Sequence, residues 1–116
     1  MELKGQSALL RIFLGEMDKI GHKPLYEEIL LAGRNQGIAG VTVLRGILSY
    51  GASTHIHTAK LLDIAEDLPV LIEIIDTEEK INQFIPTLEA LFDECGHGGL
   101  ITRETVNVLY YKPKNK

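Results

Sequence analysis

This chain of 116 residues is poor in cysteine, lacks tryptophan and has no long apolar run. Its one cysteine, Cys95, cannot form an internal disulfide. No stretch approaches the roughly 20 apolar residues that a membrane-spanning helix needs. Arg11 and Glu16 interrupt the N-terminal apolar run, so it does not have the form of a signal peptide. We therefore expect a protein of the reduced cytoplasm.

Positive charge and aromatic side chains are also scarce. The chain has 12 Lys and Arg against 16 Asp and Glu, which gives a formal net charge of −4. It has only three Phe and four Tyr. A basic field and aromatic stacking surfaces are what hold nucleic acids, so we exclude nucleic acid as a partner. The length predicts a single domain, 1–116, with little interior to spare for a pocket.

Hydrophobic patterning predicts four strands and two helices. The strands are expected at 7–14, 41–48, 70–76 and 100–111, and the helices at 24–37 and 76–95. A long loop, 49–68, joins the second and third strands, and 112–116 is a tail. Two strand–helix–strand units predict an α+β, ferredoxin-like βαββαβ fold. In that fold both helices cover one face of an antiparallel four-stranded sheet.

Several local features refine these elements. Asp76 and Glu79 have the spacing of a capping box at the start of the second helix, and Pro86 inside it predicts a kink or a later start. Gly46 permits a bulge or a close backbone approach in the second strand. Residues 61–65 of the loop have the composition of about two helical turns. Arg11 within the first strand indicates a sheet edge or a site.

The sheet face without helices is expected to be apolar. We assign to it residues such as Leu10, Ile12, Val43 and Ile74. Each buried aliphatic side chain contributes roughly 1.5–3 kcal/mol, so such a face is unfavourable in water. Self-association through this face is the expected result.

Few residues suggest catalysis or metal binding. His55 and His57 are two residues apart but have no third ligand at a recognisable spacing, so a loop histidine, or a helix cap at His57 or Thr58, is favoured over a metal site. Glu66 and Asp67 form a possible acid–base pair, although adjacent acids in loops are more often solvated. Cys95 continues the apolar stripe of the second helix and is interpreted as a core residue. No nucleophile, base and oxyanion site assembles, so no enzyme activity is predicted.

The turn Gly96-His97-Gly98-Gly99 is the clearest candidate for ligand binding. Glycines let backbone N–H groups approach phosphate or ribose oxygens without an intervening Cβ. A turn from a helix into a strand also favours glycine for its conformation alone. The turn by itself therefore leaves both interpretations open.

Four blocks of sequence resemble one family, domain of unknown function 190. They are GEMDKIGHKPLYEEIL, GIAGVTVLRGILSYG, THIHTAKLLDIAEDLPVLIEIIDTEEKI and GLIT, in that order along the chain. This family is similar in fold to the PII signal-transduction proteins, which are trimers whose sheets face one another around the central axis. The resemblance implies a PII-like homotrimer.

The resemblance also implies a ligand site between subunits. In PII-like proteins an adenine nucleotide lies between the base of the long loop and a glycine-rich turn. The positions this implies here are Ser49, Gly51, Arg45, Gly96, His97, Gly98, Gly99 and Lys112. The PII turn reads Gly-Asp-Gly-Lys, and one of the two basic positions on the last PII strand falls on Tyr110. With fewer cations, the site suits AMP or ADP better than a triphosphate.

The resemblance finally implies a regulatory role. The implied function is a non-enzymatic signalling protein, with no required cofactor, that regulates a partner through its long loop. Family members are often associated with ion-export channels, which suggests a membrane transporter or channel as partner. The blocks specific to this family contain Glu16, Lys23, Arg45, His57, Glu66 and Asp67; His55, His57, Glu66 and Asp67 are assigned to partner contact. The alternative is a small-metabolite enzyme that uses His57, Glu66 or Asp67 at a trimer cleft.

Overall fold

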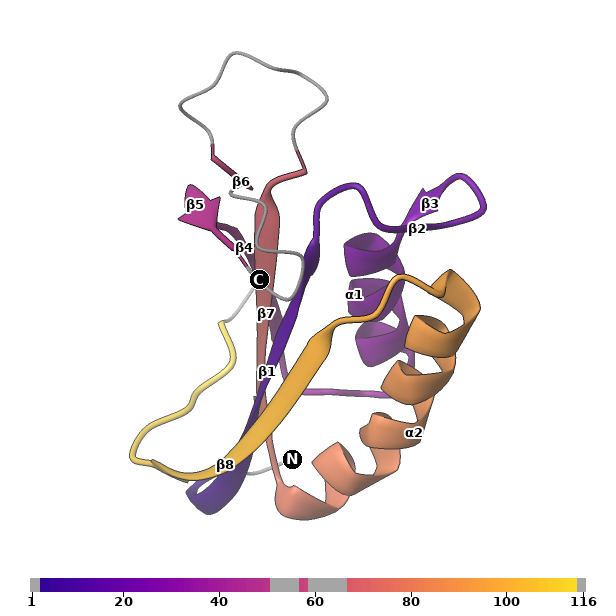
Figure 1. The fold of residues 1–116 in the computed structure, drawn as a ribbon. Helices are drawn as coiled ribbons and strands as arrows, with labels where there is room; N and C mark the ends of the chain where they lie inside the picture. Colours follow the sequence, from indigo (N-terminus) through magenta and orange to yellow (C-terminus); the bar gives the residue numbers. More distant parts are fainter. Residues whose placement is uncertain (1–2, 51–56, 59–66, 115–116) are drawn as a thin grey trace.

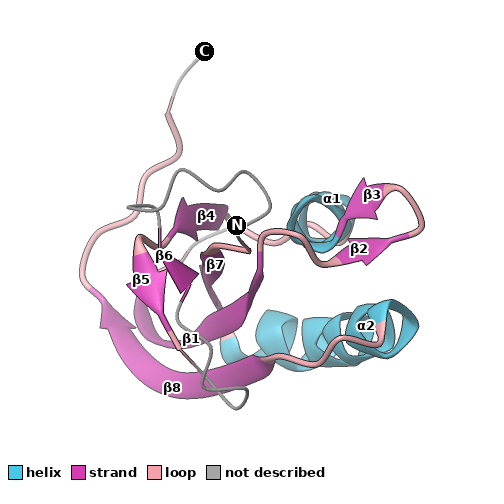
Figure 2. Ribbon diagram, turned by 45° about the horizontal axis from the view of Figure 1, so that its top comes forward, coloured by secondary structure: helices cyan, strands magenta, loops and turns pink. Residues whose placement is uncertain are grey.

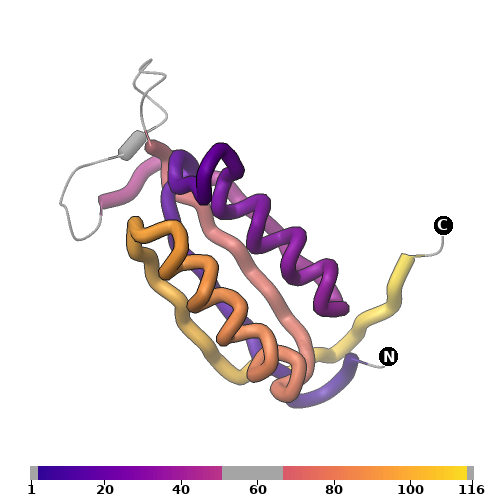
Figure 3. Tube along the Cα trace, turned by 90° about the vertical axis from the view of Figure 1, so that its right-hand side faces the viewer, coloured from indigo at the N-terminus to yellow at the C-terminus, as the bar shows by residue number. Residues whose placement is uncertain are grey.

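The computed structural model describes residues 3–50, 57–58 and 67–114. Its main sheet has the strand order β4-β7-β1-β8, with every neighbouring pair antiparallel. The bounds of these strands are β1 Gly5–Gly15, β4 Val41–Arg45, β7 Pro69–Asp76 and β8 Leu100–Val108. The helices are α1 Leu25–Asn35 and α2 Glu78–Cys95. Both helices cover the same face of the sheet (Figures 1 and 3), so the predicted α+β, ferredoxin-like fold is confirmed.

Two short strand pairs lie outside this predicted plan. The first is a hairpin of β2 Lys19–Ile20 and β3 Lys23–Pro24, which leads into α1. The second joins β5 Leu48–Ser49 to β6 His57–Thr58 within the predicted long loop. Figure 2 shows the β2–β3 hairpin beside α1 and the β5–β6 pair beyond the end of β4. The predicted helical turns at 61–65 lie outside the described residues.

The core lies between the helices and the inner face of the sheet. Leu10, Ile12 and Ile74 have no exposed surface, and Val43 packs against the same cluster. The helices fill this space with Leu25, Ile29, Ile81, Phe84 and Leu88. The assignment of Leu10, Ile12, Val43 and Ile74 to the uncovered face was therefore wrong. Along β1 the wholly apolar set Ala8, Leu10, Ile12 and Leu14 alternates with a set that contains Ser7 and Arg11, so the alternation itself favours the first set for the helix side.

The opposite, outer face carries the alternate residues of each strand. The register places Leu44, Leu71, Phe13 and Leu100 side by side in one row across all four strands. Three of these side chains are markedly exposed: Phe13 at 40%, Leu44 at 47% and Leu100 at 54%. One row of the outer face is therefore apolar, and residues other than the predicted ones make it so.

Arg11 lies in the next outward row, where it forms ion pairs with Glu73 of β7 and Glu104 of β8. The Nε–Oε2 distance to Glu73 is 3.0 Å. The hydrogen bond with Glu73 is the main cause that raises the pKa of Arg11, and Glu104 adds to it, while desolvation opposes the rise. β1 is an inner strand, so the prediction that Arg11 marks an edge was wrong.

The N-cap of helix α2 lies one residue later in the chain than predicted. Thr77 is the N-cap, and its hydroxyl accepts a hydrogen bond from the Lys80 N–H at 3.2 Å. The Asp76 carboxylate instead accepts from the N–H groups of Ala39 at 2.9 Å and Thr77 at 2.7 Å. The capping box of Asp76 with Glu79 was therefore wrong. Pro86 lies inside the helix and does not set its start.

Two predicted strands are shorter than expected. The second strand ends at Arg45 instead of continuing to residue 48, although the Gly46 N–H still bonds to the Pro69 carbonyl at 2.7 Å. A Cβ on Gly46 would lie 2.8 Å from Pro69 Cγ, so the predicted close approach at this glycine is confirmed. β8 ends at Val108, before Tyr110. No helix within the described residues is both long and apolar enough to span a membrane.

Candidate functional site

The described ends of the long loop converge where β1 turns toward β2. We call this the loop base and define it as residues 15–18, 45–46 and 67–69. The Met17 N–H donates to Asp67 Oδ1 at 2.8 Å, and the Glu16 N–H donates to the Leu68 carbonyl at 2.8 Å. These two hydrogen bonds therefore join the first of the family-like blocks directly to the third.

Gly15 and Asp67 meet at the centre of the loop base. A Cβ on Gly15 would lie 2.8 Å from Asp67 Oδ1 and 2.9 Å from its Cγ. Real Cβ contacts do not come this close, so the carboxylate occupies space that only a glycine leaves free. Asp67 was predicted as a partner-contact or catalytic residue. In the structure its carboxylate accepts the Met17 N–H in the β1–β2 turn.

Asp18 extends this network to the first helix. It is 9% exposed, and its carboxylate accepts the Gly15 N–H at 2.9 Å. Its carbonyl accepts the N–H of Leu25, the first residue of α1, at 2.8 Å. The sequence reasoning missed this role. The signal available was the position of Asp18 three residues after Gly15 within a family-like block.

Arg45 is the one predicted nucleotide-binding cation within the loop base. It forms an ion pair with Glu16, whose side chain is 21% exposed, while the Arg45 side chain is 64% exposed. Lys23, another cation of the family-specific blocks, lies on the exposed β2–β3 hairpin.

The other predicted loop residues are placed only in part. Ser49 pairs with His57 in the β5–β6 register. Gly51, His55 and Glu66 lie outside the described residues. Thr58 lies in β6, opposite Leu48, so the described backbone at His57 and Thr58 is that of a strand.

The glycine turn follows the end of α2. Gly96 and Gly98 have φ values of 80° and 76°, which only glycine adopts easily, and His97 between them is exposed. A Cβ on Gly99 would lie 2.9 Å from the Phe13 carbonyl oxygen and would overlap the Phe92 ring. Each of these three glycines therefore has a structural reason, independent of any ligand.

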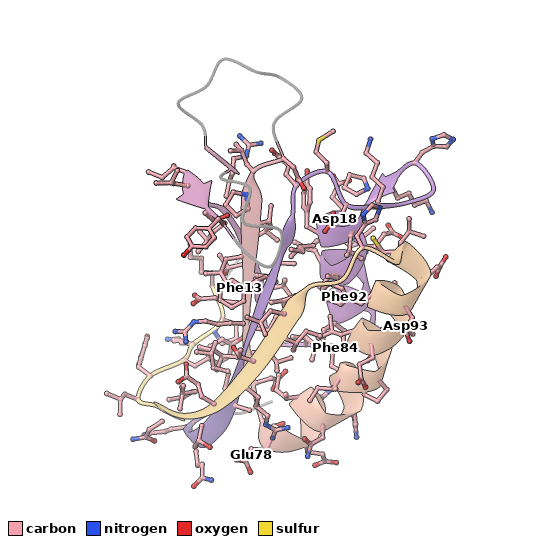
Figure 4. The ribbon with its side chains drawn as sticks, viewed as in Figure 1. Phe13, Asp18, Glu78, Phe84, Phe92 and Asp93 are labelled. Atoms are coloured by element: carbon pink, nitrogen blue, oxygen red, sulfur yellow. The ribbon has the colours of Figure 1, made fainter. Side chains whose placement is uncertain are left out.

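A cavity of about 460 Å³ opens beside this turn. Its lining residues are Glu89, Phe92, Asp93, Gly96, Gly98, Gly99 and Ile101. Figure 4 shows Phe92 and Asp93 on the last turns of α2. The two carboxylates and the negative end of the helix dipole disfavour a phosphate in this cavity. A phosphate held by the turn is therefore expected on the side that faces away from α2.

The two halves of the predicted nucleotide site lie at opposite edges of one end of the sheet (Figure 1). Arg45 ends the edge strand β4, and the glycine turn leads into the other edge strand, β8. Three strand spacings separate them, which amounts to about 14 Å. A single chain therefore does not bring Arg45 and Gly99 together.

Lys112 and Tyr110 lie after the far end of β8 from the glycine turn. Tyr110 and Tyr111 line a second cavity of about 280 Å³, which they share with Ala39, Gly40 and Ile75 among others. Tyr110 is 80% exposed, and Lys112 is exposed. Within one chain, Lys112 is thus not beside the glycine turn with which it was grouped.

The described residues offer few other candidates for metal binding or catalysis. No three His, Cys, Asp or Glu side chains of residues 3–50, 57–58 and 67–114 cluster in a way that could hold a metal ion. Cys95 ends α2, is partly buried and packs against the core, as predicted. The described residues thus leave the loop base and the glycine turn as the sites to consider.

Comparison with known proteins identifies relatives of two kinds. The family pattern of DUF190, described as "Uncharacterized ACR", matches residues 7–108. A UPF0166 protein of Aquifex aeolicus (strain VF5) is 41% identical over 102 residues, covering 88% of this chain and 92% of the relative. A UPF0166 protein of Methanocaldococcus jannaschii is 33% identical over 96 residues, covering 83% and 85%.

Solved structures of PII-like proteins have the same fold. CPII from Thiomonas intermedia K12, a nitrogen regulatory PII-like protein bound to ADP, AMP and bicarbonate, superposes with a TM-score of 0.67 at 17% identity. The alignment covers 89% of this chain and 88% of CPII. A PII-like protein of Thermus thermophilus gives a TM-score of 0.65 at 16% identity, covering 94% of both chains. At this identity the likeness establishes the fold.

Proposed function

The chain belongs to the DUF190 family and has a PII-like fold, and on this premise we propose that it is a non-enzymatic regulatory protein. Its ligand is a small adenine nucleotide, bound at clefts between the subunits of a homotrimer. Residues 1–116 act as one domain, and the long loop, 49–68, contacts the regulated partner.

One observation carries this proposal. Arg45 and the glycine turn lie at opposite edges of the same end of the sheet. When the β4 edge of one subunit meets the β8 edge of the next, the two half-sites come together. The row of Phe13, Leu44, Leu71 and Leu100 supplies an apolar outer face for the same assembly.

The charge of the site supports AMP or ADP as the ligand. CPII, which shares the fold, is bound to ADP and AMP. In this chain the loop base offers Arg45, while Glu89 and Asp93 flank the glycine turn on its helix side. Each missing charge-assisted contact removes roughly 1.5–3 kcal/mol, which weighs most heavily against a triphosphate. The neighbouring subunit's Lys112 is a further proposed phosphate contact.

The regulatory step follows from where the ligand binds. Asp67 and Leu68 join the second end of the loop to the β1–β2 turn, and Gly46, before the first end, bonds to Pro69 of β7. A ligand bound at Arg45 shifts the equilibrium between two arrangements of the loop base. The size of this shift is set by the difference in the ligand's affinity for the two arrangements. The proposed target is a membrane transporter or channel.

Isothermal titration of the protein with AMP, ADP, ATP and cyclic AMP tests the ligand. We expect binding of AMP or ADP, with one site per chain and weaker binding of ATP. Absence of heat with all four nucleotides at millimolar concentration would refute nucleotide binding. Sedimentation at micromolar concentration tests the assembly, and a species of only monomer mass would refute the trimer.

A further inference from the structure

The ion pair between Arg45 and Glu16 joins an exposed guanidinium to a carboxylate that the protein largely covers. The Arg45 side chain is 64% exposed at the end of an edge strand, whereas the Glu16 side chain is 21% exposed. A guanidinium has five N–H donors, and one carboxylate takes at most two of them. Arg45 therefore keeps donors for a second anion, but Glu16 already neutralises its charge.

Glu16 is held in place by the loop base. Its own N–H bonds to the Leu68 carbonyl, and the N–H of the next residue, Met17, bonds to the Asp67 carboxylate. On its other side, the Gly15 N–H bonds to Asp18. Hydrogen bonds on three consecutive residues thus fix the backbone that carries the Glu16 carboxylate toward Arg45.

We infer that Glu16 is an internal competitor for the anion site at Arg45, and that binding of a phosphate group there displaces its carboxylate. This inference rests on the proposed function, in which Arg45 contacts the nucleotide phosphate. It adds a regulatory step, because Glu16 and the loop-base residues Asp67 and Leu68 belong to one hydrogen-bonded unit. Phosphate binding is thereby coupled to the hydrogen bonds that close the loop base.

The competition follows from charge. A terminal phosphate is close to a dianion at neutral pH, since its second pKa is about 6. The phosphate therefore displaces the Glu16 carboxylate from the Arg45 guanidinium. Because the displaced carboxylate remains nearby, it still repels the bound phosphate. Replacing Glu16 by glutamine keeps the size and one acceptor oxygen, and it removes the charge and with it both effects. The energies of exposed ion pairs, about 0.2–1 kcal/mol, correspond to a gain in phosphate affinity of about 1.4- to five-fold.

The first experiment compares Glu16→Gln with wild type and with Glu79→Gln, by titration with AMP at one ionic strength. Glu79 is an exposed glutamate at the start of α2, next to Glu78, at the end of the molecule remote from Asp18 and the loop base (Figure 4). It gives the same change of net charge without contact to Arg45. We expect tighter binding in Glu16→Gln and no change in Glu79→Gln. Equal or weaker binding in Glu16→Gln would overturn the inference and make Glu16 a residue that positions Arg45.

The second experiment measures hydrogen exchange at the Glu16 and Met17 amides. In wild type, AMP is expected to change their exchange rates, because the displaced Glu16 strains these hydrogen bonds. In Glu16→Gln the change is expected to be smaller. The same measurement without ligand shows whether the variant keeps the loop-base fold. Identical effects of AMP in both proteins would overturn the coupling.

A third readout separates failure of the inference from failure of the proposed function. If none of the three proteins binds AMP, ADP, ATP or cyclic AMP, nucleotide binding is refuted. Inorganic phosphate is then titrated while the NMR signal of the Arg45 Nε–H is followed. Half-saturation at a lower phosphate concentration in Glu16→Gln supports competition by Glu16. Equal half-saturation, or no shift in either protein, overturns it.

Discussion

The carboxylate of Asp67 fills the space beside Gly15 that a side chain would need. A Cβ at Gly15 would lie 2.8 Å from Asp67 Oδ1. The same oxygen accepts the Met17 N–H at 2.8 Å. This contact between two residues far apart in the sequence thus connects the end of β1 to the segment just before β7.

Replacing Gly15 by alanine should disrupt the contact between Gly15 and Asp67 and lower the stability of the fold. The added methyl group displaces the Asp67 carboxylate and breaks its hydrogen bond with the Met17 N–H, which costs about 0.5–1.5 kcal/mol. Urea unfolding measures the loss. Gly40→Ala is the matched control, because a Cβ at Gly40 meets no atom within 4 Å. If both variants were equally stable, the close packing of Asp67 on Gly15 would be contradicted.

Asp76→Asn should destabilise the fold at the opposite end of the sheet. Asp76 has no exposed surface, and its two oxygens accept N–H groups from Ala39 and Thr77. An amide replaces one acceptor by a donor, which leaves a buried N–H unsatisfied at a cost of about 1–3 kcal/mol. Thermal unfolding measures this cost, and Asp93→Asn, at an exposed position of α2, is the control. A stability equal to that of the control would show that Asp76 does not hold this corner.

Ile75→Lys should prevent self-association through the outer face. Ile75 lies on the outer side of β7 and is 39% exposed. Leu31 on α1 is also 39% exposed, so Leu31→Lys introduces the same charge at equal exposure on another face. We expect sedimentation at micromolar concentration to give monomer for Ile75→Lys and trimer for wild type and Leu31→Lys. Dissociation by both variants or by neither would place the interface elsewhere.

Arg45→Gln should weaken the binding of AMP or ADP. Loss of one charge-assisted hydrogen bond corresponds to about 1.5–3 kcal/mol, or roughly 10- to 100-fold in affinity. Arg34→Gln is the control, since Arg34 lies in the last turn of α1, away from the loop base. Calorimetric titration measures both variants. Unchanged affinity in Arg45→Gln would remove Arg45 from the proposed site.

Much of the fold could be predicted from sequence because helices and strands leave periodic patterns. The apolar stripe of α2 and the glycines after it predicted that helix and its end closely. The cap was misplaced by one residue, because Asp76 and Thr77 are both good capping residues and only the contact of Asp76 with Ala39 decides between them. The candidate site was less predictable. Asp67, Gly15 and Asp18 gain their roles from contacts between separate segments.

The sequence by itself determined the order of the four main strands and two helices, the two helix faces and the family, because these depend on local spacing and composition. Only the tertiary structure decided which face of the sheet is covered. Phe13 is as apolar as Leu10 and Ile12, but it is exposed and they are buried because α1 and α2 pack on one side of the sheet. The tertiary structure also paired Glu16 with Arg45, since neighbours across a sheet end are set by strand order and register.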